Sequence, residues 1–128
     1  MRVKAFDHLV PHVTHVEKAL EFYIGALGLS LERAEEWRAG EVPLPSVRID
    51  ENTVIDLFPR ERGESNVDHI CLVVDPLDWQ EVVDSGVSGS VEDPVPRWGA
   101  RGSARSVHAR DPDDDEVEPR WYPQDARV

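Results

Sequence analysis

The chain has 128 residues, of which 40% are hydrophobic, so it has the size of one compact domain with a sizeable core. It carries 26 acidic residues against 14 lysines and arginines, and the resulting net charge of −12 argues against a nucleic-acid-binding protein because it repels phosphate backbones. Cys71 is the only cysteine, which excludes an internal disulfide. The first residues lack a signal-peptide pattern and no apolar run approaches membrane-spanning length, so we expect a cytoplasmic protein without a membrane segment.

The first predicted element is a strand at residues 5–13. Period-two alternation places Phe6, His8 and His12 on one face of this strand. Pro11 has no backbone N–H to donate, which indicates an edge or a bulge near the end of the strand.

A helix and three strands are predicted to complete the first half. Thr14 followed by Glu17 has the pattern of a capping box, and apolar residues then recur at helical spacing until Gly28 ends the helix. Strand-like segments follow, separated by turn residues, at 29–37, 43–50 and 53–59. The first half is therefore predicted to be a βαβββ module.

The second half repeats this order of elements. An apolar strand at 66–75 places His69 and Cys71 on one face. Asp75 is the predicted N-cap of a helix that ends at Gly86. Strand-like segments follow at 87–95, 103–109 and 115–122, and a loop punctuated by Pro and Gly is expected at 94–102.

Polar residues inside the apolar strands also repeat between the halves. His8 and His69 lie on the opening strands and are 61 positions apart, while Asp56 and Glu118 lie on the closing strands and are 62 positions apart. Two modules related by a pseudo-twofold axis would bring all four side chains to that axis. Neutral imidazoles and carboxylates are ligands of zinc, iron, manganese and nickel ions. The repeat therefore predicts one divalent-metal site.

Other readings of the histidines and aspartates stay open. A histidine in a strand is more often a hydrogen-bonded core residue than a ligand. Asp7 and Asp68 alternate to the opposite face of their strands and are predicted to be surface or loop hydrogen-bonding groups. His12 lies beyond the strand-breaking proline and is not expected to bind the metal, and His15 and His108 are predicted to be solvated or structural.

Several of these segments together resemble the vicinal oxygen chelate superfamily, the group of glyoxalases, bleomycin resistance proteins and extradiol dioxygenases. The resemblance covers residues 5–122, and its most specific parts are "EKALEFYIGALGL" and "DPDDDEVEPR". It implies an α+β fold in which two βαβββ modules, about 5–60 and 66–122, form a cupped mixed sheet within one domain, residues 1–128.

The resemblance also implies which residues hold the metal. Ligands in this superfamily come from the first and last strands of each module, and His8, Asp56, His69 and Glu118 fill those places. Asp56 departs from the pattern of the superfamily, because relatives commonly carry Glu, Gln or His there. Pro119 replaces an apolar strand residue and removes a ladder donor, which predicts that the last strand is an edge strand.

The reaction implied by the resemblance uses one divalent metal ion that chelates neighbouring oxygens of a small substrate and stabilises negative charge. A lyase or isomerase is favoured over a ring-cleaving dioxygenase, because an extra Tyr or His for that chemistry is not evident and the chain lacks a second module pair. Asp56 is either the fourth ligand or the general base. A homodimer is also expected from the resemblance.

Substrate contacts are predicted from the aromatic and basic residues. An Arg side chain pairs with carboxylates and a Trp side chain covers apolar or aromatic ligands. The candidates are Trp37, Arg48, Trp98 and Arg101. In the alternative reading, the two tryptophans are core or interface residues and the two arginines are solvated.

Two other functions remain open from the sequence. A metal-free protein that sequesters a cationic drug, as bleomycin resistance proteins do, would suit the net charge of −12. Such a protein has no need of His8, His69 and Glu118 together, so their presence favours the enzyme. An inactive relative with vestigial ligands is the third reading.

Overall fold

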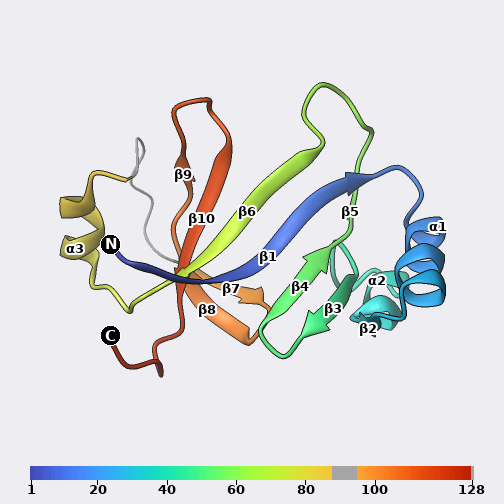
Figure 1. Cartoon of the computed structure of the whole chain (residues 1–128), viewed down its shortest axis with the longest axis horizontal. Coiled ribbons are helices and arrows are strands. Elements are labelled where there is room, and N and C mark those ends of the chain that lie inside the picture. Colours follow the sequence, from blue (N-terminus) through green and yellow to red (C-terminus); the bar gives the residue numbers. More distant parts are fainter. Residues whose placement is uncertain (88–94, 128) are drawn as a thin grey trace.

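Figure 1 shows a computed structural model of the chain, which describes residues 1–87 and 95–127. The strands are β1 (Val3–Val13), β2 (Ser30–Glu32), β3 (Ser46–Asp50), β4 (Thr53–Asp56), β5 (Phe58–Pro59), β6 (Val67–Val74), β7 (Val95–Gly99), β8 (Gly102–Ser106), β9 (Ala109–Arg110) and β10 (Glu116–Trp121). The helices are α1 (Val16–Leu20), its π-helical continuation η1 (Glu21–Ala26), α2 (Ala34–Arg38) and α3 (Trp79–Ser85). Within the described ranges, no helix has both the length and the hydrophobicity needed to cross a lipid bilayer.

The strands form one curled mixed sheet whose order is β2-β3-β4-β1-β6-β10-β8-β7, with β5 beside β1 and β9 beside β10. The central strands β1 and β6 are antiparallel, and each has a parallel neighbour on its outer side, β4 and β10 respectively. The first half contributes the strands β2-β3-β4-β1 and the second half contributes β7-β8-β10-β6, each counted from the outer edge of the sheet to its centre. The two halves are therefore related by a pseudo-twofold axis between β1 and β6. Helices α1 and α3 lie at opposite ends of the molecule (Figure 1). This arrangement confirms the predicted α+β fold.

The first helix begins one residue later than its predicted capping box requires. His15 is the N-cap, without a side-chain cap, so Glu17 is the second helical residue and cannot complete a box with Thr14. Glu17 instead accepts hydrogen bonds from Arg38 of α2. The predicted end is confirmed, because Gly28 adopts the left-handed conformation (φ 74°) that stops the helix.

The segment 29–37 was predicted to be a strand throughout, and this is wrong for its second half. Only Ser30–Glu32 pairs with β3, and the chain then turns at Arg33, which has a φ of 58°, into helix α2. The sequence "AEEWR" of α2 is rich in residues with high helix propensity, which override the short strand.

The helix of the second half starts later than predicted. Asp78, and not Asp75, is its N-cap: the Asp78 carboxylate accepts from the backbone N–H of Glu81, and the Glu81 carboxylate accepts from that of Asp78. The predicted end at Gly86 is confirmed by its left-handed conformation (φ 65°). Strand β6 lies within the predicted segment 66–75.

Two predictions concern the chain after α3. The predicted strand at 87–95 falls almost entirely outside the described residues. The predicted loop at 94–102 is instead mainly strand β7, which pairs with β8 along its whole length and joins it through a tight turn at residues 100–101. The prediction of a loop is therefore wrong for most of this segment, and only the turn between β7 and β8 agrees with it.

The prediction that Pro119 lies on an edge strand is wrong. Strand β10 is interior, with β6 on one side and β8 and β9 on the other. Pro119 is tolerated because its carbonyl accepts from the Val107 N–H at 3.0 Å in the interruption between β8 and β9. Its ring nitrogen faces the same side, where Ser106 ends one strand and Ala109 begins the next, so the missing donor falls at this break in the ladder.

The hydrophobic core is divided between the two halves. Two of its clusters each pack the helix of one half against the sheet of that half. The first contains Val16, Leu20, Val47 and Leu57, and the second contains Val74, Val82, Val107 and Trp121. The central strands β1 and β6 lie between these two clusters and carry polar side chains on their inner face.

Candidate metal centre

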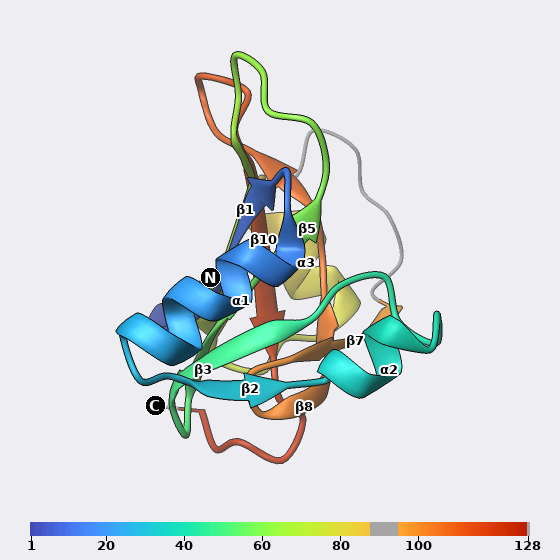
Figure 2. The same cartoon turned by 90° about the vertical axis from the view of Figure 1, so that its right-hand side faces the viewer.

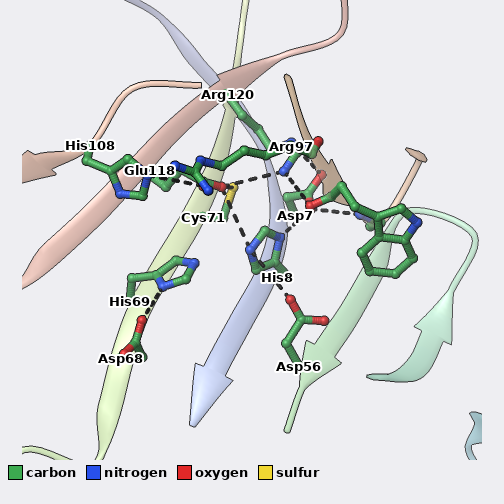
Figure 3. Close-up of polar contacts among 12 residues, drawn as sticks. Asp7, His8, Asp56, Asp68, His69, Cys71, Arg97, His108, Glu118 and Arg120 are labelled. Atoms are coloured by element: carbon green, nitrogen blue, oxygen red, sulfur yellow. Dashed lines mark hydrogen bonds and ion pairs between the residues drawn. The ribbon is translucent and has the colours of Figure 1, made fainter. Parts of the chain in front are cut away.

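Three of the four predicted ligands converge at the centre of the sheet. His8 on β1, His69 on β6 and Glu118 on β10 each offer one ligand atom, and these atoms all lie within 4.8 Å of one another (Figure 3). Nε2 of His8 is 3.8 Å from Oε2 of Glu118, and the centroids of the two imidazoles are 5.5 Å apart. His8 and Glu118 are buried, whereas His69 is partly exposed.

Strand register explains this convergence. Cys71 of β6 is paired with His8 across the antiparallel β1 and with Glu118 across the parallel β10. Paired residues on neighbouring strands point to the same face of a sheet, so the imidazole and the carboxylate stand on either side of the small thiol. His69 lies two residues before Cys71 on the same strand and therefore shares the face.

Asp56, the fourth predicted ligand, lies beside this group at the end of β4. Its Oδ2 is 3.8 Å from Nε2 of His8, but it is not among the atoms that lie within 4.8 Å of both other ligands. The Ser46 hydroxyl donates a hydrogen bond to its other carboxylate oxygen. Burial raises the pKa of Asp56, and the nearby His8, Ser46 and Arg33 only partly oppose this shift.

Asp7 and Asp68 were predicted to point away from this face, and the structure places both of them toward it. The β1–β6 ladder skips Asp7 between Phe6 and His8, and on β6 it skips Asp68 between Val67 and His69. Both aspartates thus lie at bulges, where the alternation of side chains is interrupted and a side chain is redirected. The bulge that Pro11 predicted is the second of these two.

Each redirected aspartate binds the histidine that follows it. Nδ1 of His8 donates to the Asp7 carboxylate at 2.6 Å, and Nδ1 of His69 donates to the Asp68 carboxylate at 2.8 Å (Figure 3). A proton on Nδ1 leaves the lone pair on Nε2, which is the form of imidazole that binds a metal ion. Two such imidazoles and a carboxylate are a donor set that fits a divalent cation.

Asp7 is the centre of a buried hydrogen-bond network. Besides His8, its carboxylate accepts from the backbone N–H of Ala100 at 2.9 Å and from the hydroxyl of Tyr122 at 2.5 Å. Arg120 adds a positive charge 3.7 Å away. Burial opposes ionisation of Asp7, but these contacts outweigh it and lower its pKa. The carboxylate therefore stays ionised and holds the His8 ring in one orientation.

Asp68 has a more open environment. It is half-buried and accepts from Nε2 of His12 at 3.1 Å as well as from His69. Burial raises its pKa, but the hydrogen bonds of His69 and His12 outweigh this effect, so the pKa is lowered. His12, which was not expected to be a ligand, thus contacts the carboxylate that orients His69.

Glu118 is held in place from two sides. The Cys71 thiol donates to its Oε2 at 2.8 Å, and Nη1 of Arg120 lies 3.5 Å from the same oxygen. Burial raises the pKa of the Cys71 thiol, and the negative charge of Glu118 adds to the shift, so the thiol keeps its proton. The fully buried Arg120 guanidinium also donates to backbone carbonyls and packs against Gly99.

His108, predicted to be solvated or structural, is a residue of the site that sequence reasoning missed. Its Nδ1 lies 2.8 Å from Oε1 of Glu116 and its Nε2 lies 3.9 Å from Oε1 of Glu118. The ring is 6.3 Å from that of His69, centroid to centroid. His108 belongs to the irregular stretch between β8 and β9, so it has no counterpart in the repeat that identified the other ligands.

These residues line a cavity of about 320 Å³ on the inner face of the sheet. Its wall contains all four predicted ligands, together with Arg33, Arg97, Trp98, His108, Pro96 and the apolar Pro43 and Leu44. The cavity is large enough for a small ligand that would lie directly against the ligand atoms.

Of the two predicted substrate-contacting tryptophans, the structure brings only Trp98 to this cavity. Trp37 packs against the hydrophobic cluster of the first half, which agrees with its alternative reading as a core residue. The indole of Trp98 lies on β7 and faces Arg33, whose guanidinium carbon is 3.8 Å from the ring centroid.

The two predicted arginines have other partners, and neither is part of the cavity wall that the described residues form. Arg48 binds the Glu32 carboxylate and the backbone carbonyl of Ala100. Arg101 makes two hydrogen bonds with the Asp125 carboxylate. Arginines that the sequence did not single out, at positions 33 and 97, line the cavity instead.

Comparisons of sequence do not identify a family for the chain, because no family model and no curated protein matches it. Comparisons of structure are informative. A hypothetical protein from Bacillus halodurans C-125 matches with a TM-score of 0.60 at 24% identity, over 96% of this chain and 97% of that one. A methylmalonyl-CoA epimerase from Mycobacterium tuberculosis matches with a TM-score of 0.61 at 16% identity, over 94% and 89% of the two chains.

A third solved structure is a glyoxalase/bleomycin resistance protein/dioxygenase superfamily member from Vibrio splendidus 12B01. Its TM-score is 0.60 at 12% identity, and the match covers 92% of this chain and 98% of that one. Such identities show the fold alone. The chain therefore has the glyoxalase-like fold, as its sequence motifs indicated.

Proposed function

We propose that this chain, which has the fold of the vicinal oxygen chelate superfamily, is a divalent-metal-dependent enzyme of the lyase or isomerase type that acts on a small oxygen-bearing substrate. The observation that carries the proposal is the convergence of His8, His69 and Glu118 within 4.8 Å of one another. Asp7 and Asp68 support it, because each holds its histidine with Nε2 free to bind.

His8, His69 and Glu118 would hold the metal, which would act as a Lewis acid on two neighbouring substrate oxygens. Three protein ligands leave coordination positions open for these oxygens, as catalytic metal sites do. Zinc, iron, manganese and nickel all suit this set of nitrogen and oxygen donors. The buried thiol of Cys71 and the guanidinium of Arg120 keep Glu118 in position.

Asp56 is assigned the role of general base in this proposal. It lies on the cavity wall beside His8, and burial raises its pKa, which makes the carboxylate a stronger base. The Ser46 hydroxyl fixes its orientation. The Asp56 side chain is buried, which reduces the access of water to this carboxyl.

Isomerase chemistry is supported over ring cleavage by the site and by the comparisons. When a proton leaves a carbon atom next to a chelated carbonyl and is returned to a neighbouring atom on the same face, one base and a site for the negative charge are sufficient. Asp56 and the three ligands supply these two elements. A methylmalonyl-CoA epimerase, which shares the fold at 16% identity, is an isomerase by name.

The second candidate is a metal-free protein that binds a cationic ligand. It is favoured by the net charge of −12 and by a second cleft, of about 390 Å³, beside His69. Four acidic side chains line that cleft: Glu64, Asp111, Asp115 and Glu116. The metal requirement distinguishes the two functions, because a cationic ligand in this cleft needs no dication.

Cobalt(II) substitution tests the metal site and its open positions together. Acetohydroxamate, which chelates through two neighbouring oxygens, should change the visible d–d spectrum of the cobalt-loaded protein. The change should be absent in Glu118→Gln and retained in His15→Ala, whose histidine is exposed at the start of α1. A spectrum that acetohydroxamate leaves unchanged in the wild type would show a closed site and contradict the catalytic role.

A homodimer stays part of the proposal. Large apolar side chains are exposed on η1 and on the two outer strands of the first half, at Phe22, Leu31 and Ile49. Burial of such side chains is the usual source of stability in dimers. Sedimentation velocity should give the mass of two chains, and a monomer at micromolar concentration would remove this part of the proposal.

A further inference from the structure

Arg33 occupies an unusual position in the cavity wall. It joins β2 to α2 and has a φ of 58°, a left-handed backbone conformation that residues other than glycine rarely adopt. Figure 2 shows β2 leading into α2, the junction at which Arg33 lies. Trp98 lies on β7. The Arg33 guanidinium lies over the indole ring of Trp98, with its carbon atom 3.8 Å from the ring centroid. Both side chains line the same cavity as the candidate metal ligands.

The guanidinium of Arg33 has unused hydrogen-bonding capacity. Its Nε is buried and has no hydrogen-bond partner among the described residues. Burial lowers the pKa of this side chain, and the acidic residues that oppose the shift, Asp56 first among them, act through charge alone. A buried donor without a partner is destabilising, as is a non-glycine residue in the left-handed region. Both features together indicate a group that is held ready for a ligand.

We propose that Arg33 and Trp98 form a subsite for a carboxylate group of the substrate, next to the metal centre in the same cavity. The planar guanidinium offers two parallel N–H donors to a carboxylate, and stacking on the indole fixes its plane. The inference rests on the proposed function, because the subsite would orient a substrate whose other oxygens bind the metal.

The charges of the residues around the cavity favour the binding of an anionic ligand. The two carboxylates in its wall, Asp56 and Glu118, are balanced by the two guanidinium groups of Arg33 and Arg97. A bound dication would therefore leave the cavity positive, although the chain as a whole carries a net charge of −12. A cationic ligand would be repelled from this cavity and directed to the acidic cleft.

Two matched types of ligand distinguish binding at the subsite from binding at the metal centre. Acetohydroxamate chelates the metal but has no carboxylate, whereas hydroxamates of malonic, succinic and glutaric monoacid add one at increasing reach. Titration of the cobalt-loaded wild type should give, for the best of the three, an affinity at least about tenfold higher than for acetohydroxamate, since hydrogen bonds to charged groups contribute this much.

The variants assign this gain to Arg33. Arg33→Met should remove the preference for the carboxylated hydroxamate and leave acetohydroxamate binding unchanged. Arg127→Met, which loses the same charge at an exposed position paired with Glu81, should keep the full preference. Should Arg33→Met also lose acetohydroxamate, Arg33→Lys decides: it retains the positive charge without the planar fork and should keep only part of the preference.

The outcomes are distinguishable. Equal affinities of the two ligand types in the wild type, or a preference that survives in the Arg33 variants, would overturn the subsite while the metal centre stands. Failure of the wild type to bind cobalt or either ligand would overturn the proposed function, and the subsite with it.

Discussion

Asp7 and Asp68 occupy two bulges of the same β1–β6 ladder, and each accepts a hydrogen bond from Nδ1 of the histidine that follows it. This relationship accounts for the repeated Asp-His pair in the sequence. A regular strand would send the aspartate and the histidine to opposite faces, and the bulge brings them to one. The two environments differ, however, because Asp7 is fully buried and Asp68 is half-buried.

Replacement of either aspartate should weaken metal binding through the histidine. In Asp68→Asn the amide no longer enforces the proton on Nδ1 of His69, and we expect a metal affinity about 10- to 100-fold lower, the usual effect of losing such a partner. Competition with a chromophoric chelator measures it. Asp84→Asn, on the exposed face of α3, is the control, and equal affinities of the two variants would contradict the orienting role.

The pH dependence of stability should differ in sign between Asp7 and Asp56. The pKa of Asp7 is lowered in the folded state, so its contribution to stability is present above the unfolded pKa and is lost as the pH falls. The pKa of Asp56 is raised, so its contribution is present at low pH and is lost as the pH rises through the folded pKa. Each unit of difference corresponds to about 1.4 kcal/mol.

Urea unfolding of the metal-free protein between pH 3 and 7 measures this difference. The free energy of unfolding of Asp56→Asn, relative to the wild type, should rise with pH, and that of Asp7→Asn should fall. Parallel curves for the two variants would show that the opposite pKa shifts are not present in solution.

Gly99 should not tolerate a side chain. A Cβ at this position would collide with the Arg120 guanidinium, which is fully buried and fixed by backbone carbonyls and by Asp7. We expect Gly99→Ala to lower the free energy of unfolding by about 1–3 kcal/mol, as overpacked cores do. Gly63→Ala is the matched control because its Cβ would point into open space, and equal losses in both variants would contradict the tight packing.

The parts of the fold and site that the sequence predicted are those with a regular period. The repeat placed His8, His69 and Glu118 on equivalent strands, and the ladder brings them together. Gly28 and Gly86 marked the ends of two helices because a left-handed residue there requires glycine.

The parts that could not be predicted depend on departures from regularity. Pro11 indicated a bulge near the end of the first strand, but nothing in the strand pattern places Asp7 and Asp68 at bulges, since a bulge depends on the pairing of two distant strands. Arg33 was hidden because its segment reads as a strand, and its contact with Trp98 joins two residues that lie 65 positions apart in the sequence. His108 lies between two short strands and has no equivalent in the other half.

Metal analysis by inductively coupled plasma mass spectrometry tests the central claim most directly. Protein purified without chelator or affinity metal should contain about one divalent ion per chain, as a site with three protein ligands requires. His69→Ala should retain little metal after dialysis, whereas His15→Ala, which removes an exposed imidazole, should match the wild type. Equal metal contents in the wild type and His69→Ala would contradict the shared site of His8, His69 and Glu118.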